Sequence, residues 1–258
     1  GKALYTMFDG THRTHDAAGN ALNIFSGVGV MAEYAVVHER SLVKYDPKVP
    51  ADRAALVGCA VTTGVGAAIN TAKVQPGSIC GVWGAGGVGL NVIQGCAIAG
   101  AERIIAIDTS DAKLELAKKF GATEVIKTVP GEDLTKQLKK STGGGLDYAF
   151  ECIGSGDVAA AAYKAIRKGG LAVVVGVAPA SASTSLVTRS LPFEEKTLTG
   201  SYFGSARPRE DFPKMLSLYA AGKLKLDELI TRRYTIDEAP QAFADLESGK
   251  NARGVIVF

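Results

Sequence analysis

The sequence is poor in several features, and each shortage excludes a class of protein. It has 4 cysteines in 258 residues, widely spaced, so we expect a reducing cytoplasm and no disulfide framework. Lysine plus arginine exceed aspartate plus glutamate by 29 to 26, a net charge of +3, which is too small to indicate a nucleic-acid partner. The longest apolar run, residues 171–180, is too short to span a bilayer, so we expect no membrane partner.

Glycine, by contrast, is in excess. The chain has 31 glycines, well above the usual share of about 7%, and they follow no collagen-like period. Hydrophobic residues make up 47% and charged residues 21%, which is ordinary globular usage. The glycines are therefore expected at tight turns and close backbone contacts.

The middle of the chain alternates between strand and helix patterns. Small apolar residues at helical spacing run from 51 to about 72, and a turn follows at 75–77. Strands are then expected at 78–83, 103–107, 125–126, 146–151 and 171–177, with helices at 90–99, 113–120, 133–140 and 158–167. Such alternation predicts an α/β fold with a doubly wound parallel sheet.

The two ends of the chain differ from this middle part. Residues 1 to about 55 predict short β segments, including a half-buried strand over 31–37. Near the C-terminus, helices are expected at 212–219 and 239–247 and a strand at 254–258. We predict three regions: 1–60 as part of a β-rich domain, 61–202 as a dinucleotide-binding domain, and 203–258 as a return to the first.

A glycine loop joins the strand at 78–83 to the helix that follows. Residues 84–89 fit the pattern G-x-G-x-x-G in the strand–loop–helix context that the pattern requires. Gly84 permits the tight turn, Gly86 lets backbone N–H groups approach a pyrophosphate, and Gly89 lets the helix pack against the strand. Gly87 and Val88 complete the loop, and the helix dipole faces the phosphates.

An acidic residue, Asp108, ends the next strand about 20 residues after the last glycine, as the fingerprint requires. A carboxylate there accepts hydrogen bonds from the adenosine ribose hydroxyls and repels a 2′-phosphate, which favours NAD over NADP. Lys113 follows one turn into the next helix, within reach of the same ribose or phosphate. The alternative is a glycine-rich turn without a ligand and an acidic helix cap at Asp108.

Several segments together resemble the zinc-dependent medium-chain alcohol dehydrogenases: 57–66 (VGCAVTTGVG), 74–78, 84–89, 106–108, 150–154 (FECIG), 175–179 and 248–253. The resemblance covers nearly the whole chain. It implies a Rossmann domain with a partial β-rich catalytic domain, and it implies that this chain is the C-terminal two-thirds of a longer enzyme.

The resemblance assigns Cys59 as one of three protein ligands of a catalytic zinc. The other two, a Cys and a His, and the cysteines of a structural zinc would lie upstream of Gly1. Taken alone, a cysteine in an apolar run is more often a small buried hydrophobic residue. Cys59 by itself cannot hold zinc tightly.

The resemblance also assigns residues to the cofactor and the substrate. Thr63 matches a position near the nicotinamide, and Arg253 matches a pyrophosphate-binding arginine. The side chains expected to pack on the nicotinamide or to line the substrate pocket are Val88, Val175, Val177 and Phe25.

The implied activity is zinc-assisted oxidation of a small-molecule alcohol to an aldehyde or ketone, with hydride transfer to NAD. The implied assembly is a homo-oligomer, a dimer or a tetramer. Two alternatives stay open: a zinc-free reductase of enones or quinones, and a module that binds NAD without catalysis.

Tyr219 and Lys223 also match the Y-x-x-x-K pair of short-chain dehydrogenases, but Gly222 is expected to end the helix between them.

Overall fold

The computed structural model describes residues 6–7, 9–25, 28–29, 31–249 and 251–258. The chain divides into two compact units, one formed by Val49–Leu229 and the other by Gly1–Lys48 together with Ile230–Phe258. The three regions expected from the sequence, with boundaries near 60 and 202, stay a prediction.

The larger unit is built around a six-stranded parallel sheet in the order β3-β2-β1-β4-β5-β6. The strands are β1 (Ile79–Trp83), β2 (Arg103–Asp108), β3 (Glu124–Lys127), β4 (Leu146–Glu151), β5 (Ile166–Val174) and β6 (Thr197–Gly200). The strand order reverses between β1 and β4, where ligands bind doubly wound sheets. The predicted α/β fold with a doubly wound parallel sheet is confirmed.

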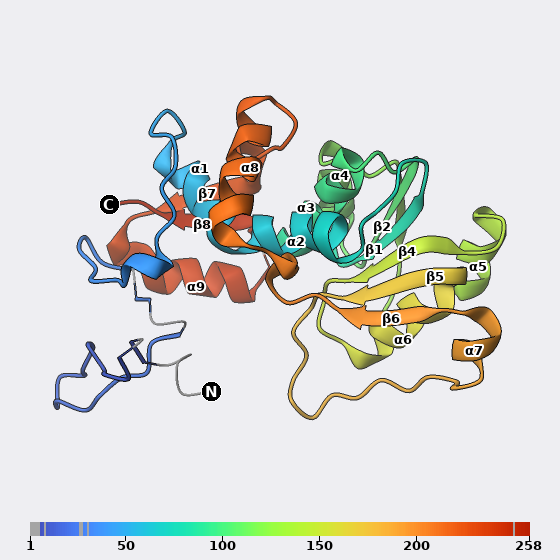
Figure 1. Cartoon of the computed structure of the whole chain (residues 1–258), viewed down its shortest axis with the longest axis horizontal. Coiled ribbons are helices and arrows are strands. Elements are labelled where there is room, and N and C mark those ends of the chain that lie inside the picture. Colours follow the sequence, from blue (N-terminus) through green and yellow to red (C-terminus); the bar gives the residue numbers. More distant parts are fainter. Residues whose placement is uncertain (1–5, 8, 26–27, 30, 250) are drawn as a thin grey trace. The chain divides into compact units, whose positions relative to one another are not determined.

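Helices cover both faces of this sheet, as Figure 1 shows. They are α3 (Gly87–Ile98), α4 (Asp111–Lys119), α5 (Thr135–Ser141) and α6 (Gly156–Ala165). On one face, α5 and α6 bury Leu138 and Tyr163 against Trp83 and Ile105 of the strands. Strands covered on both sides are nearly all apolar, which is why the middle of the sequence predicted them well.

The expected boundary between α6 and β5 is wrong. The sequence predicted a helix as far as Arg167 that stops at two glycines, but α6 ends at Ala165 and β5 begins at Ile166. Ile166 pairs with Leu146, and the register then shifts before Leu171 pairs with Tyr148. The glycines lie inside this irregular strand, and Gly169 has φ +69°, so they mark a bulge rather than a helix stop.

A long helix precedes the sheet. It comprises α1 (Ala51–Leu56), a π-helical segment (Val57–Val61), α2 (Thr62–Gly66) and a second π-helical segment (Ala67–Thr71). Of the described helices, this is the one that by length and composition alone could cross a membrane, but 56% of its apolar window is buried within the protein. A helix packed into a core has the same composition, so its apolar character does not indicate a membrane span.

The chain after β5 adds α7 (Ser190–Glu194), α8 (Pro208–Ala220) and the 3₁₀ turns Phe203–Ser205 and Asp227–Leu229. Helix α8 ends at Ala220, Gly222 has φ +68°, and the Tyr219 hydroxyl donates to Asp227. Gly222 therefore ends the helix before Lys223, as expected.

The smaller unit pairs β7 (Ile230–Tyr234) with β8 (Arg253–Ile256) in parallel, and α9 (Ala239–Glu247) joins them, with 3₁₀ turns at Glu39–Ser41 and Ile236–Glu238. Arg232, Tyr234 and Gln241 donate hydrogen bonds to the buried carboxylate of Asp245.

The strand expected over 31–37 is wrong. These residues form bends and coil, and Tyr34 and Val36 are 90% and 81% exposed. Alternating apolar residues form a strand only where a neighbouring strand completes the hydrogen bonds, and none pairs with them among the described residues.

Alanine substitutions at two glycines of the long helix, Gly64 and Gly58, test how closely this helix packs on α3. A methyl group on Gly64 would lie 2.5 Å from the Val88 carbonyl oxygen and 2.7 Å from the Val92 nitrogen, whereas one on Gly58 would meet nothing within 4 Å. We expect Gly64→Ala to lower the free energy of unfolding by about 1–3 kcal/mol. Gly58→Ala should be neutral or stabilising by about 0.5–1 kcal/mol. Urea denaturation of both variants checks this, and equal effects would contradict the described packing.

Candidate functional site

The glycine loop lies at the carboxyl end of β1, where α3 begins. Gly84 has φ +91°, a conformation that costs other residues energy. A methyl group on Gly89 would lie 1.7 Å from the carbonyl oxygen of Gly84, so only glycine allows α3 to approach the strand this closely. The protein's own packing thus explains both glycines.

Gly86 differs, because the protein's packing does not explain it. It is the N-cap of α3, so no side chain caps the first turn, and a methyl group on it would meet nothing within 4 Å. The first N–H groups of a helix have no partner within it and carry the positive end of the helix dipole. The N–H groups at Gly87 and Val88 are therefore well placed to bind an anion.

Asp108, the last residue of β2, is hydrogen-bonded to the glycine loop. Its Oδ2 accepts from the Ala85 N–H at 2.7 Å, and its Oδ1 accepts from the Ser110 N–H at 2.9 Å. The carboxylate is half-buried, and each oxygen keeps a lone pair for another donor. The expected role of Asp108 as a ligand of a ribose stays a prediction, and its hydrogen bond to the glycine loop was not expected from the sequence. Lys113 is half-buried in the first turns of α4.

Cys59 and Thr63 lie one helical turn apart on the long helix. Cys59 is exposed within a π-helical segment, and the Thr63 hydroxyl donates to the Cys59 carbonyl oxygen at 2.9 Å. The neighbouring Gly64 packs against the Val88 carbonyl. The helix thus brings Cys59 and Thr63 toward the first turn of α3.

The described residues do not by themselves fit a zinc ion. Within the described ranges, no three His, Cys, Asp or Glu side chains lie close enough together to hold a metal. Zinc takes three protein ligands in catalytic sites and four in structural ones, and the Cys59 sulfur is one donor.

The other cysteines contrast with Cys59. Cys80 and Cys96 are buried, as is usual for a cysteine that serves as a small hydrophobic residue within an apolar run. Burial raises the pKa of the Cys96 thiol, and its hydrogen bond with Cys80 raises it further. Burial, and next the Glu151 carboxylate, raise the pKa of the Cys152 thiol. Among the four thiols, Cys59 is the exposed one.

The segment after β5 carries the next predicted site residues. Val175 is buried and its N–H donates to the Glu151 carbonyl oxygen at 2.8 Å, whereas the Val177 side chain is 91% exposed. Glu151 lies within the segment 150–154 that carries the family resemblance, but the sequence indicated no role for it. Its side chain is fully buried.

The remaining predicted residues belong to the smaller unit. Arg253 is half-buried at the start of β8, and Phe25 is 69% exposed. Their expected relations to the pyrophosphate and the substrate stay predictions. Lys250, within the segment 248–253, lies outside the described residues.

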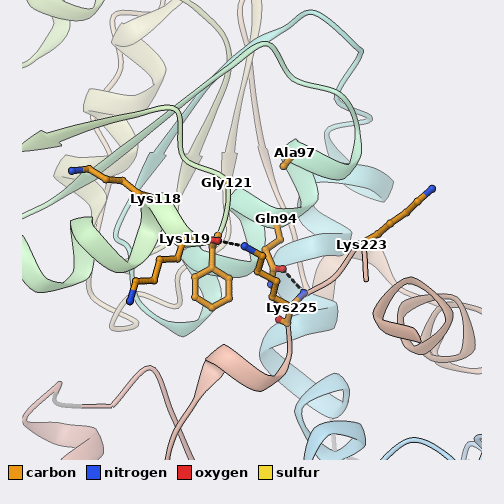
Figure 2. A pocket seen from close by; sticks show the side chains of 8 residues that line it. Gln94, Ala97, Lys118, Lys119, Gly121, Lys223 and Lys225 are labelled. Carbon is orange, nitrogen blue, oxygen red and sulfur yellow. Dashed lines mark hydrogen bonds between the residues drawn. The ribbon is translucent and has the colours of Figure 1, made fainter. Parts of the chain in front are cut away.

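A pocket of about 250 Å³ lies at the other end of α3 from the glycine loop. Its lining comprises Gln94, Ala97, Lys118, Lys119, Phe120, Gly121, Lys223 and Lys225. Gln94 exchanges two hydrogen bonds with the backbone of Lys225, whose Nζ donates to the Lys119 carbonyl. Figure 2 shows Lys118 and Lys223 pointing away from the pocket. It holds none of the residues predicted for the site.

The strand order and the strand–loop–helix geometry together define a Rossmann-like α/β domain of the kind found in dehydrogenases. Residues 87–221 match the family model for zinc-binding dehydrogenases. The chain belongs to this zinc-binding dehydrogenase family, of the medium-chain alcohol dehydrogenase type.

Individual relatives agree with this assignment. The chain is 42% identical over 255 residues to an alcohol dehydrogenase class-3 of Myxine glutinosa, covering 97% of this chain and 66% of that protein. Benzyl alcohol dehydrogenase from Acinetobacter calcoaceticus superposes with a TM-score of 0.86 at 34% identity, covering 93% of this chain and 67% of that one. A zinc-binding domain protein of the alcohol dehydrogenase type from Burkholderia ambifaria has a TM-score of 0.92 at 31% identity, covering 98% and 69%.

The contrast between the thiols gives a chemical test of this part of the structure. The thiolate is the reactive form, and each unit of raised pKa lowers its fraction about tenfold. Because Cys59 is exposed, Cys80 and Cys96 are buried, and the pKa values of Cys96 and Cys152 are raised, we expect iodoacetamide to modify Cys59 first in the native protein. The other three cysteines should react only after denaturation. Peptide mass spectrometry locates the adducts, with Cys59→Ser as the control. Fast modification of Cys80 or Cys96 in the folded protein would show that the described burial is wrong.

Proposed function

We propose that the enzyme containing this chain oxidises an alcohol to an aldehyde or ketone and transfers the hydride to NAD. The observation that carries the proposal is the uncapped N-terminus of α3 at Gly86, with the Asp108 carboxylate fixed beside it through the Ala85 N–H. This arrangement offers N–H donors to a pyrophosphate and an acceptor to a sugar hydroxyl.

The residues present fit a dinucleotide. The open space at Gly86 lets a phosphate approach the first N–H groups of α3. Asp108 accepts the hydroxyls of the adenosine ribose through its remaining lone pairs and disfavours a 2′-phosphate by charge repulsion, so we propose NAD rather than NADP. When bound, NAD supplies the hydride-accepting ring carbon. Val88, Val175, Val177 and Thr63 orient that ring, and Lys113 contacts the ribose or phosphates.

The substrate class follows from the relatives, which are named as alcohol dehydrogenases. We propose that Cys59 is one sulfur donor to zinc, whose other donors the described residues do not supply. The chain spans 66% of the length of its curated relative, so the activity belongs to the whole enzyme. A homo-oligomeric state and a cytoplasmic location are proposed with it.

Two measurements test the function. Calorimetric titration of this chain should show one NAD bound per chain with little affinity for NADP. The enzyme that contains it should reduce NAD in the presence of a primary alcohol, and removing zinc with a chelator should abolish the activity. Activity that survives complete zinc removal would favour the zinc-free reductase alternative, and NAD binding without turnover in the whole enzyme would favour the binding module.

Gly86→Ala separates ligand binding from folding at the glycine loop. Because a methyl group there meets no protein atom within 4 Å, thermal stability should not fall. The methyl group would occupy the space of the pyrophosphate, so NAD affinity should fall about tenfold or more, which corresponds to about 1.4 kcal/mol. Gly58→Ala, also in open space, is the control and should bind NAD normally. Unchanged NAD affinity in Gly86→Ala would contradict the proposed position of the pyrophosphate.

A further inference from the structure

Glu151 is the last residue of β4, at the point where the strand order reverses. In the sheet it pairs with Trp83 of β1 on one side and with Val174 of β5 on the other. Its side chain has no exposed surface. A fully buried carboxylate is costly unless hydrogen bonds compensate it, so its surroundings need an explanation.

The two oxygens of this carboxylate differ in their hydrogen bonds. Oε1 accepts backbone N–H bonds from Ile153 at 2.7 Å, Gly154 at 2.7 Å and Ser155 at 3.4 Å. Oε2 is buried and has no hydrogen-bond partner among the described residues. The single oxygen Oε1 thus fixes the turn 153–155 that leads into α6, through hydrogen bonds strengthened by its charge.

Close contacts place the turn 153–155 between the glycine loop on one side and the segment 175–177 on the other. On one side, a methyl group on Gly84 would lie 2.8 Å from the Ile153 side chain. On the other side, a methyl group on Gly154 would lie 2.5 Å from the Val177 carbonyl oxygen, and one on Gly176 would lie 2.8 Å from Glu151 Oε2. The glycine loop, the turn and the segment 175–177 therefore close around the Glu151 carboxylate.

We propose that Glu151 is a positioning residue for the nicotinamide half of the bound dinucleotide, an inference that rests on the proposed function. In this fold each half of the sheet binds one mononucleotide. The glycine loop and Asp108 serve the adenosine half, and β4 and β5 lie in the other half. Because its oxygens are sealed from solvent, Glu151 acts through the turn 153–155 and the segment 175–177, not by touching the ligand.

The experiment compares three ligands on the full chain: AMP, ADP-ribose and NAD, of which only NAD carries the nicotinamide. Glu151→Gln keeps the shape of the side chain but removes its charge and leaves an amide NH₂ without an acceptor. We expect NAD affinity to fall about tenfold, the size of a weakened charge-assisted hydrogen bond, while AMP affinity changes less than about twofold. The matched control is Asp147→Asn at the opposite end of β4, whose carboxylate accepts from Ile79 and Arg167. This variant should retain the affinity for all three ligands.

Each outcome bears on the inference. Equal weakening of AMP and NAD by Glu151→Gln would assign Glu151 a general structural role and overturn the proposal, as would unchanged NAD affinity. If the unsubstituted chain binds neither AMP nor NAD, the proposed function itself fails and this inference falls with it.

A second measurement needs no variant and covers the case in which Glu151→Gln does not fold. In the unsubstituted chain, NAD should slow hydrogen exchange at the amides of Ile153 and Gly154 more than AMP does. Equal protection by the two ligands would overturn the proposal.

Discussion

The structure depends on how closely helix α3 approaches the carboxyl end of β1. The backbone of Gly89 lies so near the Gly84 carbonyl that no side chain fits between them. This contact fixes the direction of the helix and leaves its first N–H groups at the edge of the sheet. Gly64 of the long helix packs on the same first turn, so the segment that carries Cys59 and Thr63 is positioned by the same close packing. The proposed anion site exists because glycine occupies each of these positions.

The sequence predicted much of the larger unit because its strands are buried on both faces. A strand such as β1 is nearly all apolar and is followed by a glycine, so its bounds are legible without a structure. The glycine loop and Asp108 were found for the same reason, since their spacing reflects a local strand–loop–helix geometry. The same rules failed where structure depends on distant partners. Residues 31–37 have the alternation of a strand but pair with no strand in the part of the chain that the structure describes, and the short edge strand β6 has too few residues to give a pattern.

The candidate site was less predictable than the fold. The resemblance assigned Cys59, Thr63 and Val175 to the site, but side-chain contacts between segments far apart in the sequence cannot be read from a motif. The spacing of Asp108 from the glycine loop was legible, but the hydrogen bond that its carboxylate accepts from the Ala85 N–H was not. The closeness of Gly176 to Glu151 is visible only once β4 and β5 pair. The sequence did hold a signal for Glu151, because the acid that ends the expected strand 146–151 is followed, after Cys152 and Ile153, by Gly154. That pattern predicts a buried acceptor for turn N–H groups, and the same physics applies at Asp108.

The two carboxylates at this sheet edge differ in burial, and the difference fits the separate roles proposed for them, ligand recognition and positioning. Asp108 ends β2 and Glu151 ends β4, so they stand on either side of β1, and each accepts N–H groups from the loop beside it. Asp108 is only half-buried, so it can hold its loop and still accept a hydroxyl from a ligand. Glu151 is fully buried and has one oxygen without a partner, so its charge acts on the backbone alone. A carboxylate that binds ligand must keep some contact with solvent, whereas one that shapes the site benefits from burial because its hydrogen bonds strengthen in a low dielectric. The difference in exposure between these two residues is therefore the physical basis for assigning them different roles.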